Sequence, residues 1–113
     1  MSNKYNFTHK KGDTFKAVNF QYKINGNPID FTNCIIKMQL RKECGGAIAL
    51  SLTSVDDSGI TIYDATNGNF RINEQIIDCA SGTYNYDIQI TYENGVVESY
   101  LEGNFIINCD ITR

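Results

Sequence analysis

The residues best suited to acid–base chemistry lie in the last third of the chain. There, two runs of alternating apolar residues flank Asn94-Gly95, the preferred centre of a two-residue β-hairpin turn. If these two residues form the turn, Asp87 faces Glu102 directly across two antiparallel strands. The Cβ atoms of such a pair lie about 4.5–5.5 Å apart. A retaining glycosidase uses two carboxyl groups near that separation to cleave a sugar chain.

The same pairing has two interpretations that involve no catalysis. Like charges directly opposed on a sheet repel each other, so they need a cation nearby. Lys37 and Arg41 alternate outward on another strand and could supply it within the domain. A Lys or Arg side chain of a partner protein could supply it from outside. Because an open sheet face rarely forms the cleft that catalysis needs, we favour these two interpretations over an enzyme.

The predicted register gives the hairpin two distinct faces. On one face Tyr92 opposes Val97, and the pairs further from the turn are almost all apolar. On the other face Gln89 opposes Tyr100, among amides and carboxylates. A tyrosine beside adaptable amides is typical of protein interfaces, and equally of any half-solvated strand. The candidate protein-contact residues are Asn85, Asp87, Gln89, Tyr100 and Glu102.

The sequence contains no motif for nucleophilic catalysis or metal binding. His9 is the only histidine and no G-x-S-x-G occurs, so we expect His9 to be an ordinary edge residue. The segment Asp56-Asp57-Ser58-Gly59 carries oxygens that calcium could use. It lacks the alternating ligands of an EF-hand loop, and we interpret it as a capped turn. We therefore predict that the protein is not an enzyme and has no catalytic residue, metal or cofactor.

The four cysteines have the spacing of neither a zinc site nor a redox motif. None belongs to a C-x-x-C pair. The first ten residues lack the apolar core of a secretory signal, and no apolar run approaches the ~20 residues of a membrane span. We expect synthesis in a reducing cytosol, no membrane contact, and reduced cysteines that mostly fill space: Cys34, Cys44, Cys79 and Cys109.

Composition limits the class of protein. The chain has 113 residues, of which 42% are hydrophobic and 20% charged, which predicts one domain over residues 1–113 with a single core. The formal net charge is −3, which argues against a nucleic-acid partner. Tryptophan is absent, which excludes a Trp-based platform for carbohydrate.

Alternation with a period of two residues runs through most of the chain and indicates strands. Turn residues interrupt it, for example at Asn25-Gly26 and Asn67-Gly68. Residues 73–80 are the least regular and fit either a helical turn or a loop. No stretch has a helical period over three turns. The sequence therefore predicts an all-β fold, an immunoglobulin-like antiparallel β-sandwich of seven or eight strands, with residues 1–10 as an N-terminal arm.

Several segments, in this order, resemble one phage protein family: 11–15, 25–32, 38–41, 82–88, 94–107 and 110–113. They include Lys11-Gly12-Asp13-Thr14-Phe15, Gly82-Thr83-Tyr84-Asn85-Tyr86-Asp87-Ile88 and the closing Asp110-Ile111-Thr112-Arg113. The series resembles the domain at the N-terminus of phage baseplate upper proteins, which also occurs as a stand-alone protein. The resemblance implies an immunoglobulin-like sandwich that acts as an adaptor in the virion, with no catalytic residues. No stalk or receptor-binding module follows Arg113, so we expect a stand-alone subunit.

Three functions follow from these observations. The leading hypothesis is a virion structural protein, synthesised in the bacterial host cytoplasm. It would serve as an adaptor or decoration subunit at the tail or baseplate, the neck or the capsid. It would bind other virion proteins, as one copy of a homo-oligomeric ring or lattice. The first alternative is a small carbohydrate- or host-surface-binding module. The second is a hydrolase built on Asp87 and Glu102.

Overall fold

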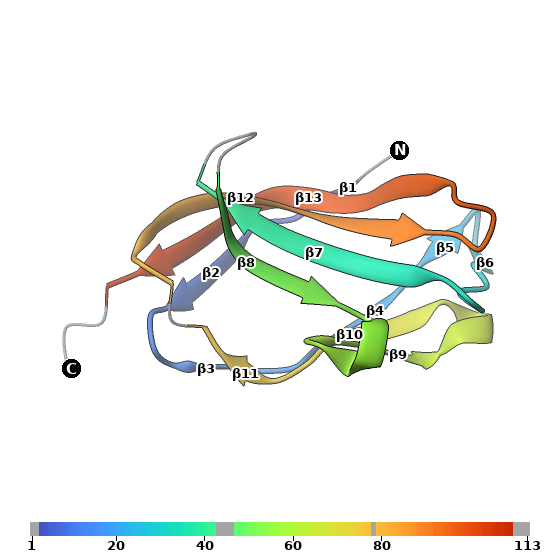
Figure 1. Cartoon of the computed structure of the whole chain (residues 1–113), viewed down its shortest axis with the longest axis horizontal. Helices are drawn as coiled ribbons and strands as arrows, with labels where there is room; N and C mark the ends of the chain where they lie inside the picture. The colour runs from blue at the N-terminus through green and yellow to red at the C-terminus, as the bar shows by residue number, and fades with distance from the viewer. Residues whose placement is uncertain (1–2, 43–46, 78, 110–113) are drawn as a thin grey trace.

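Alternating apolar side chains give each long strand one buried face, and two layers of strands bury these faces against each other (Figure 1). The computed structural model describes residues 3–42, 47–77 and 79–109. Within these ranges eight strands have four or more residues and five have two. The predicted immunoglobulin-like β-sandwich is therefore confirmed. No helix in the described part of the chain is long and apolar enough to cross a membrane.

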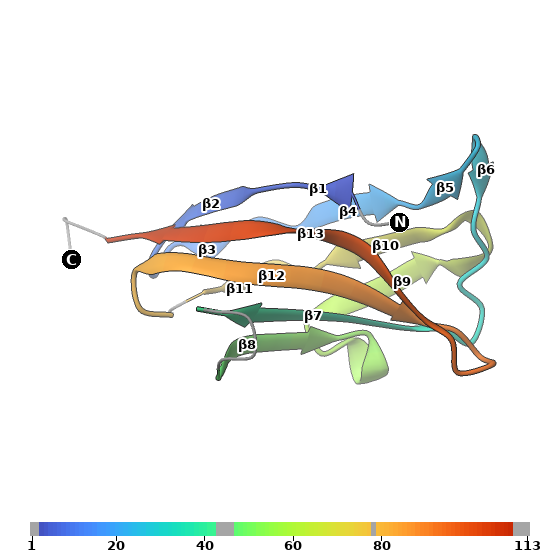
Figure 2. The same ribbon diagram turned by 90° about the horizontal axis from the view of Figure 1, so that it is seen from above.

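The larger layer is a six-stranded sheet. Its order is β1 (Asn3–Lys4), β13 (Val97–Asn108), β12 (Gly82–Thr91), β7 (Ile35–Arg41) and β8 (Ile48–Thr53), with β2 (Phe7–Lys10) also along β13. The strands β1 and β2 run parallel to β13, while the other pairs are antiparallel. The segment predicted as an N-terminal arm thus lies, from residue 3 onward, beside β13 (Figure 2).

The smaller layer is a three-stranded sheet of β4 (Val18–Gln21), β10 (Asn69–Ile72) and β9 (Ile60–Asp64), in that order. Two short pairs extend it: β3 (Thr14–Phe15) with β11 (Gln75–Ile76), and β5 (Lys23–Ile24) with β6 (Asn27–Pro28). The single-turn helices are η1 (Val55–Asp57) and η2 (Ala65–Asn67). The strand orders β13-β12-β7-β8 and β4-β10-β9 match G-F-C-C′ and B-E-D of immunoglobulin domains.

A tyrosine corner, another feature of immunoglobulin-like sandwiches, fixes the start of β12. The Tyr84 hydroxyl donates a 2.6 Å hydrogen bond to the Ala80 carbonyl oxygen. The preceding segment, which the sequence left open as a helical turn or a loop, contains the short strand β11, paired with β3. Asp78 lies outside the described residues.

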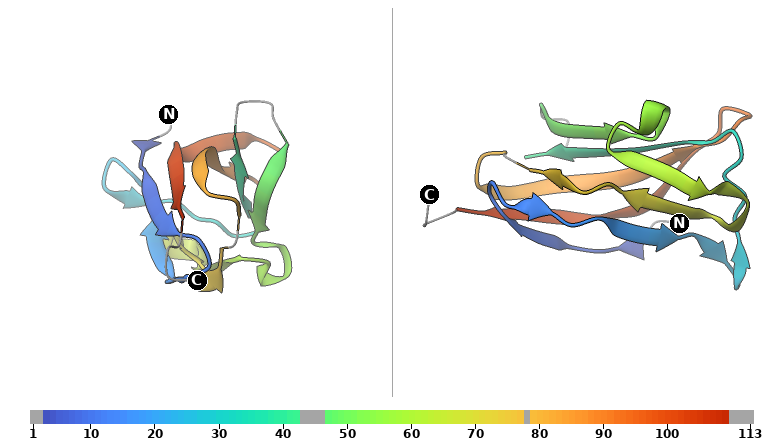
Figure 3. Two further views of the ribbon diagram at one scale, coloured as in Figure 1. Left: turned by 90° about the vertical axis from the view of Figure 1, so that its left-hand side faces the viewer. Right: turned by 90° about the horizontal axis from the view of Figure 1, so that it is seen from below.

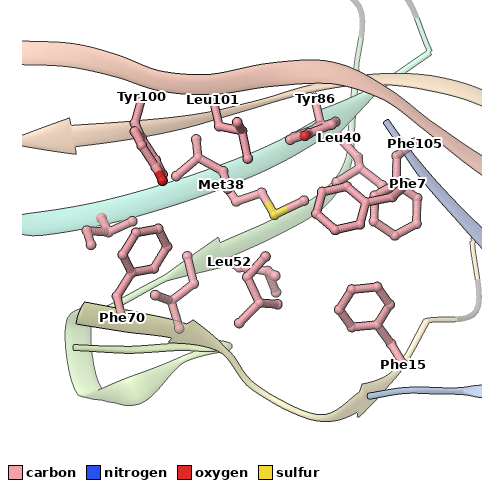
Figure 4. Packing of buried hydrophobic residues seen from close by; sticks show 14 of the residues in the cluster. Phe7, Phe15, Met38, Leu40, Leu52, Phe70, Tyr86, Tyr100, Leu101 and Phe105 are labelled. Atoms are coloured by element: carbon pink, nitrogen blue, oxygen red, sulfur yellow. The ribbon is translucent and has the colours of Figure 1, made fainter. Parts of the chain in front are cut away.

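The core fills the space between the two layers, and aromatic rings make up almost half of the buried residues that the structure describes there (Figure 4). Phe7 stacks on Phe105 with ring centroids 5.3 Å apart, and Phe20 stacks on Phe70 at 5.2 Å. Among the described residues no charged or polar side chain is buried. The most deeply buried large side chains are Phe31, Phe70, Phe105, Ile36, Met38, Leu40, Ile60, Ile72, Ile88, Ile90 and Ile107.

The turn between β12 and β13 differs from the prediction. The Tyr92 N–H donates to the Val96 carbonyl, and the Gly95 N–H donates to the Tyr92 carbonyl, both at 2.8 Å. Gly95 has φ +88°, so the loop has three residues and ends on a left-handed glycine. Tyr92 therefore faces Val96, and the predicted pairing of Tyr92 with Val97 is wrong.

A β-bulge in β13 restores the predicted register. Gln89 pairs with Ser99, whereas Ile88 pairs with Leu101, so Tyr100 is the extra residue. From Ile88 to Tyr84 every pair is as predicted, including Asp87 opposite Glu102. The extra residue of the bulge compensates for the extra residue of the turn.

The bulge turns Tyr100 into the core, which corrects its predicted position on the polar face. Its side chain is only 9% exposed. Its ring packs against Tyr22 at 4.4 Å and against Phe70 at 5.8 Å, between ring centroids. Burying a tyrosine ring removes about 150–250 Å² from water, worth several kcal/mol at about 25 cal/mol per Å². That gain in free energy exceeds the cost of interrupting the backbone hydrogen bonds between β12 and β13 at one residue.

Candidate protein-contact face

The outward side of the six-stranded sheet carries a surface depression of about 700 Å³. Four of the five predicted contact residues line it, and Tyr100 does not. We call this surface the polar face. Its lining residues are Lys4, Asn6, Gln39, Arg41, Asn85, Tyr86, Asp87, Gln89, Glu102, Gly103 and Asn104.

The centre of the polar face is the opposed carboxylate pair. Asp87 pairs with Glu102 of β13 on one side and with Gln39 of β7 on the other. The Gln89 side-chain amide donates a 3.1 Å hydrogen bond to an Asp87 carboxylate oxygen. The sequence-derived opposition of these two acids is therefore confirmed, and an amide already holds one of them in place.

Cations lie on both sides of this pair, on the strands next to β13 and β12. Lys4 of β1 pairs directly with Glu102. On the far side, Arg41 pairs with Asn85, two residues before Asp87 on the same face of β12. The Arg41 guanidinium donates to the Gln39 side-chain oxygen at 3.2 Å. The face is thus charge-balanced and rich in both donors and acceptors, as in polar protein interfaces.

The N-terminal strands form one wall of the depression, because Gly103 lets them approach β13. A Cβ at Gly103 would overlap the Tyr5 carbonyl oxygen and lie 2.8 Å from the Asn6 side-chain oxygen. The Tyr86 hydroxyl donates to that Tyr5 carbonyl, and the Asn104 N–H donates to the Asn6 side chain at 3.0 Å. These contacts fix the chain where β1 passes into β2.

Lys4 and Asn6 of the N-terminal segment are members of the polar face that sequence reasoning missed. Alternation showed that Tyr5 and Phe7 belong to a strand, but not which strand lies beside it. Only the parallel pairing with β13 brings Lys4 to Glu102. Pairing order depends on the tertiary fold, so no local signal could have found these residues.

The other candidate residues have structural roles. His9 Nε2 lies 2.9 Å from the Asp13 carbonyl oxygen, and the ring packs edge-on against Phe15. Across residues 3–42, 47–77 and 79–109, no group of three His, Cys, Asp or Glu side chains is placed to hold a metal.

The acidic segment predicted as a capped turn forms η1 and the turn after it. Asp56 and Asp57 adopt positive φ values of +54° and +53° there.

The cysteines lie apart in the fold. Cys34 and Cys79 are half-buried and pack against the core, while Cys109 is exposed. Burial raises the pKa of the Cys34 thiol, which favours its neutral form. Cys44 lies outside the described residues.

The family model of the BppU N-terminal domain, the domain of baseplate upper proteins, matches residues 2–111. The chain belongs to this family. The family is a structural domain of the phage baseplate, a part of the virion in which proteins bind one another. Of the virion locations that the sequence left open, the baseplate is the one that the family supports.

Solved structures with similar folds come from distant proteins. CopC from Methylosinus trichosporium OB3b has a TM-score of 0.47 and 12% identity, over 91% of this chain and 84% of CopC. The extracellular domains 3–5 of Drosophila OTK have a TM-score of 0.40 and 19% identity, over 90% of this chain and 32% of that one. No curated protein matches the chain.

Proposed function

We propose that the chain is a non-enzymatic adaptor of the phage baseplate that binds another virion protein through the polar face. The observation that carries this proposal is the match of the BppU N-terminal domain to residues 2–111. A protein of that family works by contact with neighbours, and the polar face offers four side chains for such a contact: Asn85, Asp87, Gln89 and Glu102.

The chemistry of the polar face fits a protein partner better than a sugar. Carbohydrate sites usually offer an exposed aromatic ring on which the sugar stacks. Tyr86 is the one aromatic residue among those lining the depression, and it is only 4% exposed. Amides and balanced charges instead suit the polar loops and strands of another protein.

Cross-linking of intact particles with a lysine-reactive reagent tests the proposal. Lys4 and Lys37 lie on or beside the polar face and are exposed. We expect both to cross-link to another virion protein. Lys16 follows β3 in the other layer and is the control, because its side chain is 84% exposed but faces away. Intermolecular links from Lys16, with none from Lys4 or Lys37, would contradict the proposed face.

A further inference from the structure

Three loops meet at one end of the sandwich (Figure 3). Each of them contains an Asn-Gly turn. They are residues 22–34 between β4 and β7, residues 64–69 from the end of β9 to the start of β10, and residues 92–96 between β12 and β13. Their glycines Gly26, Gly68 and Gly95 have φ values of +80°, +69° and +88°. Such values favour glycine, so the course of each turn is set by its sequence. We call these three loops together the loop end.

Hydrogen bonds link the first loop to each of the other two: the Asn33 side-chain amide donates to a Glu93 carboxylate oxygen of the third loop at 3.4 Å, and two backbone bonds join the first and second loops. The Tyr22 N–H donates to the Gly68 carbonyl at 2.9 Å, and the Phe31 N–H donates to the Ala65 carbonyl at 2.7 Å. A Cβ at Gly68 would lie 2.7 Å from the carbonyl oxygens of Tyr22 and Ile29, so the loops pack backbone against backbone there. A surface ordered in advance loses less conformational entropy on binding.

The loop end exposes apolar side chains that the core does not use. Ile24 at the tip of the β5–β6 hairpin is 45% exposed, and Val96 and Val97 beside the last turn are 53% and 55% exposed. All six residues of the hairpin, 23–28, are exposed, so the hairpin contributes no residue to the buried core of the domain. Exposed apolar residues on a rigid scaffold are typical of contact surfaces.

The charge of the loop end is acidic. The three loops carry three carboxylates, Asp30, Asp64 and Glu93, against the single ammonium group of Lys23. Hydrogen bonds from Thr32 lower the pKa of Asp30, and hydrogen bonds from Asn67 and its neighbours lower the pKa of Asp64. Both groups therefore stay ionised at neutral pH. A complementary partner surface is basic.

A second depression, of about 390 Å³, opens between the first and third loops. It is large enough for one long side chain. Carboxylates and a tyrosine ring are the groups that hold a Lys or Arg side chain. Its lining residues are Asp30, Thr32, Cys34, Tyr92, Glu93 and Asn94.

We infer that the loop end is a second docking surface of the adaptor, for a basic surface of a neighbouring virion protein that inserts a Lys or Arg side chain between Asp30 and Glu93. This rests on the proposed adaptor function, since an adaptor joins two partners and needs two surfaces. The molecule measures 26 × 26 Å across its long axis. That cross-section corresponds to a footprint of roughly 700 Å², close to the ~800 Å² per partner of a standard interface.

Complementation of a phage that lacks the encoding gene tests this inference. The test variant combines Ile24→Lys with Glu93→Lys, which reverses the charge of the loop end and removes an apolar contact. The control combines Ile76→Lys with Glu74→Lys on and beside β11, where Ile76 is 67% exposed. Copies per particle are measured by quantitative mass spectrometry. We expect the copy number of the test variant per particle to be at least about tenfold below that of the wild type. The copy number of the control should stay within about twofold of the wild type.

Incorporation of the test variant at the wild-type level would overturn the inference. Absence of the wild-type chain itself from the complemented particles would instead overturn the adaptor function, so the two failures are distinguishable. Melting curves of the purified variants show whether both are folded. If the double variant melts early, Glu93→Lys alone decides the question, because it leaves the β5–β6 hairpin intact.

Discussion

The Tyr22 hydroxyl donates a 2.6 Å hydrogen bond to the Glu98 carboxylate, and this contact joins the two layers of the sandwich at the loop end. The Tyr92 hydroxyl donates to the same carboxylate oxygen at 3.3 Å. Glu98 reaches both phenols because the bulge at Tyr100 reverses the faces of β13 beyond it. The one extra residue of the bulge thus puts Tyr100 and the hydrogen-bonded Glu98 carboxylate on the same face of β13.

Replacing Tyr22 with phenylalanine tests the strength of this contact. The variant keeps the ring in the core but removes the shorter of the two hydrogen bonds to Glu98. Hydrogen bonds to a charged group contribute about 1.5–3 kcal/mol, so the free energy of unfolding should fall by that amount. Urea denaturation measures it. Tyr63→Phe, at a site 46% exposed, is the control and should change the value by less than about 0.5 kcal/mol. Equal effects of the two variants would refute the contact.

Stability should fall at alkaline pH. Burial, together with the charge and hydrogen bond of Glu98, raises the pKa of Tyr92 to about 12. Tyrosine in an unfolded chain titrates near pH ~10. Because the folded state holds the proton more tightly, the stability from Tyr92 is complete below pH ~10 and is lost as pH rises toward ~12.

Urea denaturation at pH 9 and pH 11 measures this loss. Burial also raises the pKa of Tyr22 above its usual range, so Tyr92→Phe should reduce the loss without abolishing it. An unchanged loss in the Tyr92→Phe variant would show that Tyr92 does not take part.

Gly103→Ala should release the N-terminal strands from β13. The new methyl group would overlap the Tyr5 carbonyl oxygen, which is backbone and cannot rotate away. We expect a loss of about 1–3 kcal/mol and faster hydrogen exchange of the Tyr5 amide, which normally donates to the Glu102 carbonyl at 2.9 Å. Gly95→Ala is the control for the exchange measurement: its φ of +88° strains an alanine within the β12–β13 turn, but no atom lies within 4 Å of the new Cβ, so exchange at Tyr5 should stay at the wild-type rate. Unchanged exchange at Tyr5 in Gly103→Ala would contradict the close approach.

The two acids Asp87 and Glu98 should respond in opposite ways to conversion into amides. Asp87→Asn removes the repulsion with Glu102 and still accepts from Gln89, so stability should rise by about 0.2–1 kcal/mol. Glu98→Gln weakens two charge-assisted hydrogen bonds and should lower stability. Thermal melting of the pair measures both. A marked loss in Asp87→Asn would mean that the carboxylate stabilises the fold rather than a contact.

The hairpin shows what alternation can and cannot predict. Residues two apart on a strand share a face, so Asn85, Asp87 and Gln89 could be grouped from sequence, and pairing added Glu102. The turn was misjudged by one residue, because Asn94-Gly95 serves both two- and three-residue loops. Tyr100 was placed on the wrong face, because a bulge that buries an aromatic ring leaves no mark on a pattern of alternation.

The rest of the polar face depends on contacts between distant segments. Lys4 lies 98 residues from Glu102 in the chain, and no sequence feature specifies that the two strands pair in parallel. The immunoglobulin-like class followed from strand number and turn residues. The order of the strands, and therefore the cations that flank the acidic pair, required the tertiary structure.

The most direct test of the adaptor function is the copy number of the chain in purified phage particles. Quantitative mass spectrometry would compare it with the major capsid protein in whole particles and in isolated tails. We expect a few copies per particle, as in a small symmetric ring, retained in the tail fraction. Absence of the chain from clean particles would contradict the function proposed for it.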